Sequence, residues 1–348
     1  MLIEYPSYME KFRCVGGSCP DTCCAGWIVD VDEESYYYYQ TVPGKFGERL
    51  RQHLKDEDGA KYFPMTREKR CPFLNRQNLC DIFTELGEDR LCQVCTEYPR
   101  WYTRVGYYEQ QDLSLSCMES ARLFFTEPEI SYCRAMSEDP GTGLTPAEEE
   151  ALVQTLAVRN EGLEILQDEG TLAEKLERLR SLSGMPEEKA GETEAAGLRI
   201  LLKHLERLDP LNETWETAMA QLCGLCCSPE ATDRTLEERR QLRESPLYQT
   251  WFTRLAMYFW FRYLLDGVQQ DYTENASILN MERGFHMTER SLQTIELMCI
   301  ARIREKNGNV WPKTLSSVFK VGDMMDVSHI FSKEVEHDAE NLEILQWR

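Results

Sequence analysis

Four cysteines stand within eleven residues near the start of this chain, at Cys14, Cys19, Cys23 and Cys24. Five more follow by residue 117: Cys71, Cys80, Cys92, Cys95 and Cys117. Nine of the fourteen cysteines therefore lie in the first 117 of the 348 residues. Thiols this closely spaced are rarely gathered for core packing alone, so they either form disulfides or bind a metal ion or cluster.

The pattern favours a metal. Two of the cysteines precede a proline, at Cys19-Pro20 and Cys71-Pro72, and proline restricts the chain around a ligand by fixing φ. Thiolates are ligands for zinc and for iron–sulfur clusters, and each takes four donors. The five histidines are scattered, and only His53 lies in the cysteine-rich part, so a mixed cysteine and histidine site is disfavoured.

The compartment also bears on this choice. The N-terminal MLIEYPSYMEKFRC lacks the basic and apolar regions of a secretory signal. The most apolar run, residues 251–265, is interrupted by Arg254 and Arg262, so we expect no membrane span. These features predict a cytoplasmic protein, where thiols stay reduced and a metal is favoured over disulfides.

The formal net charge is −21, which argues against nucleic acid as a partner because phosphates require a basic surface. An acidic surface attracts a basic partner, such as a lysine-bearing protein. The alternative reading is that the acidity mainly keeps the protein soluble.

The order of turn signals and helix signals predicts a mainly α fold in two parts. Residues 1–125 are rich in cysteine, glycine and proline and have room only for short, irregular elements, so we expect a metal-cluster domain there. A linker is expected over 126–144, and an all-helical domain over 145–348. Thr145 and Glu148 form a capping box with Pro146 at the first helical position, and Thr171 and Glu174 form a second capping box.

Helical periodicity recurs through the second part. Leucines from Leu198 to Leu208 keep the i, i+3, i+4, i+7 spacing of one apolar helix face. Further helices are expected at about 212–226, 231–243, 247–266, 272–283 and 288–306. The aromatic side chains between Trp251 and Tyr263 are interpreted as core, with a cage for a methylated ammonium as the alternative.

Two segments outside the cysteines could contribute to a site. Tyr98 and Arg100 follow Cys95 directly, so we expect them beside the metal. Arg100 could offset thiolate charge or hold a cofactor carboxylate, or it could form a surface salt bridge. Glu334 and His337 are spaced to share a helix face, where Glu334 could steer a lysine; a solvated face is the alternative.

The cysteine strings carry a resemblance to a known family. FRCVGGSCPDTCCAGW, CPFLNRQNLCDIFTELGEDRLCQVCTEYPR and SLSCMESARL look like the flagellin lysine-N-methylase family, which belongs with a broader group of zinc- or iron-chelating cysteine-rich proteins. The C-terminal FSKEVEHDAENLEIL also resembles the end of that family. The central stretch, about 135–245, carries no matching motif.

The resemblance implies a ligand set, a cofactor and an activity. Its pattern falls on eight cysteines, with Cys92 as a local addition: Cys14, Cys19, Cys23, Cys24, Cys71, Cys80, Cys95 and Cys117. Family members are thought to bind a 4Fe–4S cluster, and zinc is the alternative. How the eight thiols divide between sites stays open.

Two hypotheses follow. In the first, the chain is an enzyme that transfers methyl groups from S-adenosylmethionine to lysines of flagellin or a similar surface protein. In the second, it is a non-catalytic or redox iron–sulfur or zinc protein that binds a protein partner. The usual donor-binding patterns are missing, because Cys19, Cys23 and Cys24 give CxxxCC rather than CxxxCxxC, and no glycine-rich strand-to-helix turn is present.

Overall fold

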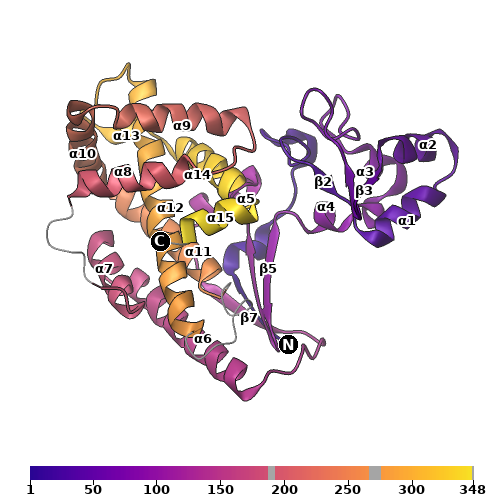
Figure 1. The fold of residues 1–348 in the computed structure, drawn as a ribbon, viewed down its shortest axis with the longest axis horizontal. Coiled ribbons are helices and arrows are strands. Elements are labelled where there is room, and N and C mark those ends of the chain that lie inside the picture. The colour runs from indigo at the N-terminus through magenta and orange to yellow at the C-terminus, as the bar shows by residue number, and fades with distance from the viewer. Residues whose placement is uncertain (187–192, 266–275, 347–348) are drawn as a thin grey trace.

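The computed structural model describes residues 1–186, 193–265 and 276–346 (Figure 1). The chain is mainly α, as predicted, and every strand of the described residues lies before residue 137. The chain forms a large helical body with one sheet against it and a small lobe, residues 14–97, that projects to the right in Figure 1.

The sheet of the body has four strands in the order β5-β6-β1-β7. They are β1 (Leu2–Pro6), β5 (Arg100–Val105), β6 (Tyr108–Leu113) and β7 (Tyr132–Met136). β1 pairs parallel with β6 and antiparallel with β7. A parallel pair needs a long crossover, and here the small lobe and β5 form it, so the lobe is an insertion between β1 and β5.

The small lobe has short elements, as the density of turn signals predicted. Its sheet has the antiparallel order β2-β4-β3, with β2 (Val29–Asp30), β3 (Lys55–Glu57) and β4 (Ala60–Phe63). Its helices are α1 (Glu33–Thr41), α2 (Gly44–His53), α3 (Asp81–Leu86) and α4 (Gln93–Glu97). Tyr39, Leu50, Phe63 and Phe73 form the centre of a small separate core.

The helical body begins at α5 (Met118–Thr126), which packs against α14, and continues after β7. Its other helices are α6 (Pro146–Gln167), α7 (Leu172–Leu182), α8 (Glu194–Leu205), α9 (Glu213–Leu225), α10 (Pro229–Arg243), α11 (Pro246–Tyr263), α12 (Ala276–Lys306), α13 (Leu315–Val318), α14 (Val321–Val335) and α15 (Ala339–Gln346). α11 and α12 pack together at the centre of the body. The predicted division at residues 125 and 145 stays a prediction, although β7 lies inside the expected linker.

Local signals placed most helices correctly. The capping boxes at Thr145 and Thr171 are both present, and the leucine face of α8 is buried. The aromatic residues of α11 are core, because Phe259 and Trp260 are fully buried.

One helix prediction is wrong. Two helices were expected at 272–283 and 288–306, but α12 runs unbroken from Ala276 to Lys306; residues 272–275 lie outside the described part. Gly284 does not end a helix. A Cβ there would lie 2.6 Å from Leu264 Cδ1, so the glycine permits close packing against the end of α11.

Within residues 1–186, 193–265 and 276–346, no helix combines the length and the apolar character that a bilayer crossing requires.

Candidate functional site

The nine N-terminal cysteines fall into two groups in space. Five of them, which we call the core thiols, belong to the hydrophobic core of the small lobe: Cys24, Cys71, Cys80, Cys92 and Cys95. The Sγ atoms of Cys92 and Cys95 are 3.4 Å apart, and the Cys71 amide donates to the Cys24 carbonyl at 2.7 Å. Cys92, set apart as a local addition in the sequence, is therefore a full member of this group.

The other four, the junction thiols, lie where the small lobe meets the body: Cys14, Cys19, Cys23 and Cys117. Cys117 stands directly before α5 and packs against the core of the body. Burial raises the pKa of Cys117 to about 11, and the nearby thiols of Cys19 and Cys14 add to the rise. Cys14 and Cys23 are exposed.

Cys23 and Cys24 are neighbours in the chain but belong to different groups. The indole Nε1 of Trp27 donates to the Cys23 carbonyl at 2.8 Å, and the Cys71 amide holds the Cys24 carbonyl. The two thiols hydrogen-bond each other, which raises the pKa of Cys23 and lowers that of Cys24 to about 7. Two residues of the small lobe thus hold the backbone at this step, Trp27 at Cys23 and Cys71 at Cys24.

The fit to a metal is mixed. Cysteine-rich groups of this size supply the donors that zinc and iron–sulfur clusters use. In the part of the chain that the structure describes, however, no three Cys, His, Asp or Glu side chains converge closely enough to hold a metal ion. The predicted eight-cysteine ligand set therefore stays a prediction, and no reaction step is derived through a metal.

Three rings meet beside the junction thiols. The ring of His337 lies 5.1 Å from Trp27 and 5.9 Å from Tyr98, and Trp27 and Tyr98 are 5.7 Å apart, between centroids. Burial raises the pKa of Tyr98, and the thiol of Cys117 raises it further. Tyr98 and His337, far apart in the sequence, are thus brought together, with His337 accessible to solvent.

The other two predicted site residues lie elsewhere. Arg100 is exposed, and its guanidinium lies 5.5 Å from the ring centroid of Phe12. Glu334 is fully buried and accepts from the Leu211 amide at 3.0 Å, so it holds the start of α9 instead of facing His337. Burial raises the pKa of Glu334 to about 7.

Helix α14 fixes the cysteine loop through Asp21. The carboxylate of Asp21 lies 2.6 Å from His329 Nε2 and accepts from Lys333 Nζ at 3.0 Å. Burial alone would raise the pKa of Asp21, but the His329 hydrogen bond and the Lys333 charge lower it to about 2. The Lys333 ammonium also lies 4.9 Å from the Trp27 ring centroid, so one helix face positions both loop residues.

A buried set of hydroxyls stands behind His337. Its Nε2 is 2.6 Å from Ser116 Oγ and 3.0 Å from Ser114 Oγ, and Tyr98 OH is 3.0 Å from Ser116 Oγ. Ser114 also contacts Ser332 at 3.2 Å. These serines were not predicted as site residues. Their place in the strings that carry the family resemblance, SLSC before α5 and FSKEVEHD near the C-terminus, was the signal that could have identified them.

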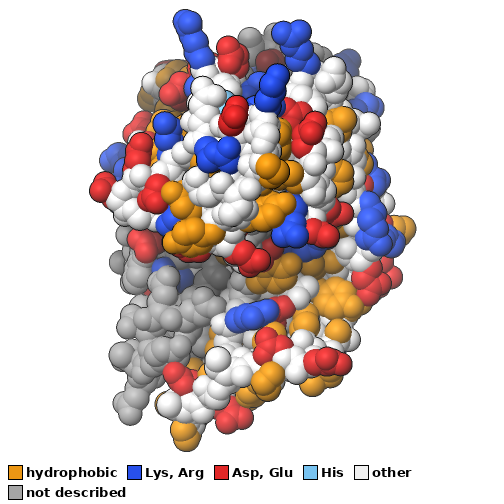
Figure 2. Space-filling model, turned by 90° about the vertical axis from the view of Figure 1, so that its right-hand side faces the viewer, with side chains coloured by type: hydrophobic (Ala, Val, Ile, Leu, Met, Phe, Trp, Pro, Cys, Tyr) orange, Lys and Arg blue, Asp and Glu red, His pale blue; other side chains and the backbone are white. Residues whose placement is uncertain are grey.

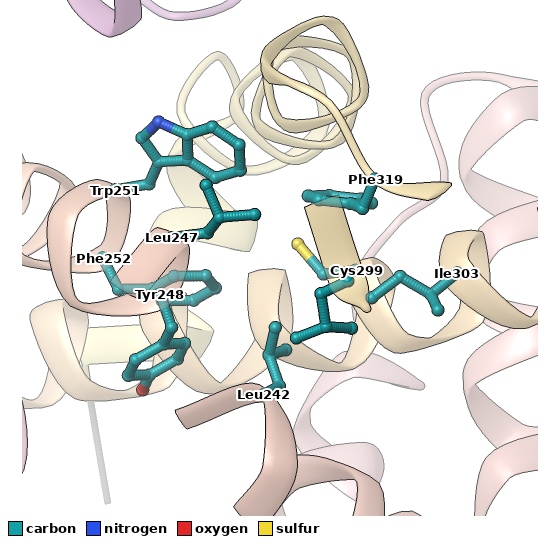
Figure 3. A pocket seen from close by; sticks show the side chains of 9 residues that line it. Leu242, Leu247, Tyr248, Trp251, Phe252, Cys299, Ile303 and Phe319 are labelled. Carbon is teal, nitrogen blue, oxygen red and sulfur yellow. The ribbon is translucent and has the colours of Figure 1, made fainter. Parts of the chain in front are cut away.

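Two cavities lie elsewhere in the body, and none of these residues lines them. One, shown in Figure 3, is apolar, is lined by Leu242, Phe252 and Phe319 among others, and measures about 10 Å³, which is too small for a cofactor. The other is an open groove of about 780 Å³ beside Thr171, Glu237 and Arg240.

Comparison with known proteins gives distant relatives. The chain is 26% identical over 134 residues to a Lysine-N-methylase of Salmonella typhimurium, which is 36% of this chain and 33% of that protein. The Flagellar biosynthetic protein FliU of Salmonella muenchen matches at 26% over 134 residues, 36% of this chain and 79% of that protein. A Lysine-N-methylase of Salmonella choleraesuis matches at the same identity and covers 33% of that protein.

The similarity is therefore partial. No family model and no solved structure matches the chain. The match spans about a third of the length of the two lysine-N-methylases. The resemblance seen in the cysteine strings is confirmed at this level, as a distant similarity to proteins named lysine-N-methylase and FliU.

Proposed function

We propose that this chain is a protein-lysine N-methyltransferase that acts on flagellin or a similar surface protein, in the cytoplasm, before the substrate is exported. The similarity to two proteins named Lysine-N-methylase carries the proposal. The name of FliU, a flagellar biosynthetic protein, supports a flagellar substrate. The favoured site is the junction of the small lobe and the body, where the rings of Trp27, Tyr98 and His337 lie beside the junction thiols.

The junction suits a lysine side chain. Aromatic faces attract ammonium groups, and Trp27 and Tyr98 are half-buried aromatics beside His337. A lysine must lose a proton before its nitrogen can attack a methyl donor, and a partly desolvated site favours the neutral amine. We propose that Trp27 and Tyr98 bind the lysine stem and that His337 orients its nitrogen.

We propose S-adenosylmethionine as the methyl donor and the eight cysteines of the resemblance as ligands of a 4Fe–4S cluster, with zinc as the alternative. The junction thiols would supply one set of four donors: Cys14, Cys19, Cys23 and Cys117. When bound, the metal group would supply redox chemistry or a contact for the donor. Arg100, an exposed side chain at the start of β5, is proposed to bind the carboxylate of the donor.

Methylation of flagellin tests the proposal directly. The full chain is reconstituted anaerobically with iron and sulfide or with zinc, and incubated with flagellin and S-adenosylmethionine. Cys117→Ser is compared with Cys133→Ser, a half-buried thiol on β7 that belongs to neither group. We expect lysine methylation with wild type and Cys133→Ser and a loss with Cys117→Ser. Absence of methylated lysine with metal-loaded wild type would overturn the proposal.

The second candidate is a non-catalytic or redox metalloprotein that binds a protein partner. Two observations favour it: the core thiols sit inside a hydrophobic core, and Ile28, Tyr37 and Phe83 of the small lobe are exposed. Figure 2 shows this end of the molecule, with hydrophobic patches among interspersed acidic and basic side chains. Metal analysis with visible absorption, together with no methyl transfer, would support this function.

A further inference from the structure

A continuous chain of hydrogen bonds runs from the accessible ring of His337 into the core of the body. It passes from His337 to Ser116 and Ser114, then to Ser332, and ends at the carboxylate of Glu336. The serines and Glu336 are at most 2% exposed. The chain therefore joins a solvent-accessible imidazole to a deeply buried anion.

Glu336 is held as an acceptor. Tyr258 OH donates to its two oxygens at 2.9 and 3.0 Å, and Tyr263 OH donates at 2.6 Å. Arg262 Nε lies 3.3 Å from the same carboxylate, and both side chains are fully buried. The carboxylate faces a cation and two hydroxyl donors, so it acts as an acceptor, and Ser332 donates its proton to Glu336.

Counting protons fixes the direction of every other bond. Each serine has one hydroxyl proton. Ser332 donates its hydroxyl proton to Glu336, so in the contact between Ser114 and Ser332 it is Ser114 that donates. Ser114 then accepts from Ser116, whose Oγ lies 2.7 Å away. Since the Ser116 proton is used there, the short contact from Ser116 to His337 Nε2 requires the imidazole to donate.

From this we propose that the buried chain of Ser114, Ser116, Ser332 and Glu336 holds His337 as the neutral tautomer with its proton on Nε2, so that Nδ1 offers a lone pair to an N–H donor of the ligand. Among the described residues, none hydrogen-bonds Nδ1. The identity of that donor as a lysine amine rests on the proposed function. The serines and Glu336 are positioning residues.

The electrostatics agree with a neutral ring. The Nε2 edge of the ring is enclosed against Ser114 and Ser116, and this desolvation lowers the pKa of His337 to about 3; the charges of Arg262 and Lys333 lower it further. The same proton count excludes a hydrolase-like reading. Ser116 accepts from His337 and does not donate to it, so the imidazole cannot activate the Ser116 hydroxyl as a nucleophile.

Nitrogen NMR of the full chain labelled with ¹⁵N-histidine tests this. The chain has five histidines, and His337→Gln assigns the relevant signals. At neutral pH we expect a protonated, pyrrole-type Nε2 and a pyridine-type Nδ1 for His337. A protonated Nδ1, or an imidazolium, in wild type would overturn the inference.

Two buried serines of α14 provide the variant and its control. Ser332→Ala cuts the link to Glu336 and frees the Ser114 proton for Nε2, so we expect the two nitrogen signals to move toward each other. Ser328→Ala removes a hydroxyl one turn earlier that has no hydrogen-bond partner in the structure, and should leave them unchanged. Equal shifts in both variants, or none in Ser332→Ala, would contradict the chain.

An amine probe tests what Nδ1 does. Adding n-butylammonium, which carries the end of a lysine side chain, should shift Nδ1 of His337 more than the nitrogens of His329. No Nδ1 shift up to saturating probe would overturn the acceptor role. The expected effect of Ser332→Ala on methyl transfer is about a tenfold fall in kcat/KM, rescued by Ser332→Thr. The NMR measurement of the tautomer needs no enzyme activity. The tautomer can therefore be confirmed when methyl transfer is absent, and methyl transfer can be observed when the tautomer is wrong.

Discussion

In the helical body the core is a continuous set of aliphatic and aromatic side chains, of which Leu166 and Trp260 are fully buried. In the small lobe the core is far smaller, and Cys71 and Cys92 are two of its buried members. Short strands and helices bury little apolar area, so such a lobe gains limited stability from packing alone. The comparison indicates that the thiols stabilise the small lobe, whereas hydrophobic packing stabilises the body.

The two thiol groups differ in the same way. Among the core thiols Cys71 and Cys92 are buried in the lobe, whereas Cys14 and Cys23 of the junction thiols are exposed. Enclosed thiols suit a structural role, and accessible ones suit contact with a substrate or donor. The Cys71→Ser prediction compares the two regions directly, and the predictions after it test the body and its junction with the lobe.

The largest effect is expected from Cys71→Ser in the small lobe. If the core thiols hold a metal, the loss of its binding is a loss of folding free energy, which we expect to exceed about 5 kcal/mol. The control is Cys299→Ser, a buried thiol in the body whose Sγ contacts Met324 Sδ at 3.7 Å. It should cost about 1–2 kcal/mol. Denaturant unfolding of metal-loaded protein measures both, and similar costs would contradict the division.

The next effect concerns the buried ion pair of the body. Arg262→Met leaves Glu336 without its cation in a fully buried position, which costs about 3–5 kcal/mol. Arg254→Met, on the same helix, removes only bonds to the Phe124 and Pro128 carbonyls and should cost less than half as much. Thermal unfolding measures the difference. A small loss in Arg262→Met would mean that Glu336 is not held as an anion.

Packing in the body is tested by a glycine pair. A Cβ at Gly162 would lie 2.2 Å from Trp260 Nε1, so Gly162→Ala should destabilise by about 1–3 kcal/mol. Gly197, on α8, has nothing within 4 Å of such an atom. Gly197→Ala should therefore stabilise by up to about 1 kcal/mol, as alanine favours the helix. Denaturation midpoints with opposite signs are the expected result, and destabilisation by both would contradict it.

Two pH-dependent effects of opposite sign are expected near the end of α14. The pKa of His337 is lowered to about 3, so between pH 3 and about 6.5 the unfolded chain binds more protons and stability falls as the pH falls. The pKa of Glu334 is raised to about 7, so its folded form binds more protons and stability falls as the pH rises from about 4.5 to 7.

Two substitutions separate these contributions. His337→Gln should flatten the acid side of the melting-temperature profile, and Glu334→Gln should flatten the side near neutral pH. Profiles that keep the wild-type slope in both variants would mean that neither group has the shifted pKa.

Sequence signals predicted local structure well and long-range structure poorly. The capping boxes at Thr145 and Thr171 and the leucines of α8 each act within one helix, so the sequence alone reveals them. The insertion of the small lobe between β1 and β5 depends on strand pairing over more than a hundred residues, which no local pattern encodes. The expected break between two helices over 272–306 was wrong for the same reason, because the packing of Gly284 against Leu264 is a contact that no local pattern encodes.

The candidate site was predicted in parts. Tyr98 and His337 were chosen separately, and only the fold brings their rings within 5.9 Å. Glu334 shares a helix end with His337, but its carboxylate turns to the Leu211 amide because the loop before α9 lies on that side. Ser332 and Glu336 were missed because polar residues on a helix usually face solvent, and their burial depends on the packing of α14.

The most direct measurement is methylation of flagellin by metal-loaded protein in which one junction ring is removed. Trp27→Leu is compared with Tyr37→Leu, an exposed aromatic of the same lobe away from the three rings. Mass spectrometry of flagellin incubated with S-adenosylmethionine should show methylated lysines with wild type and Tyr37→Leu, and at least about tenfold less with Trp27→Leu. Equal methylation by Trp27→Leu would contradict the placement of the site at the junction, and none by wild type would contradict the proposed activity.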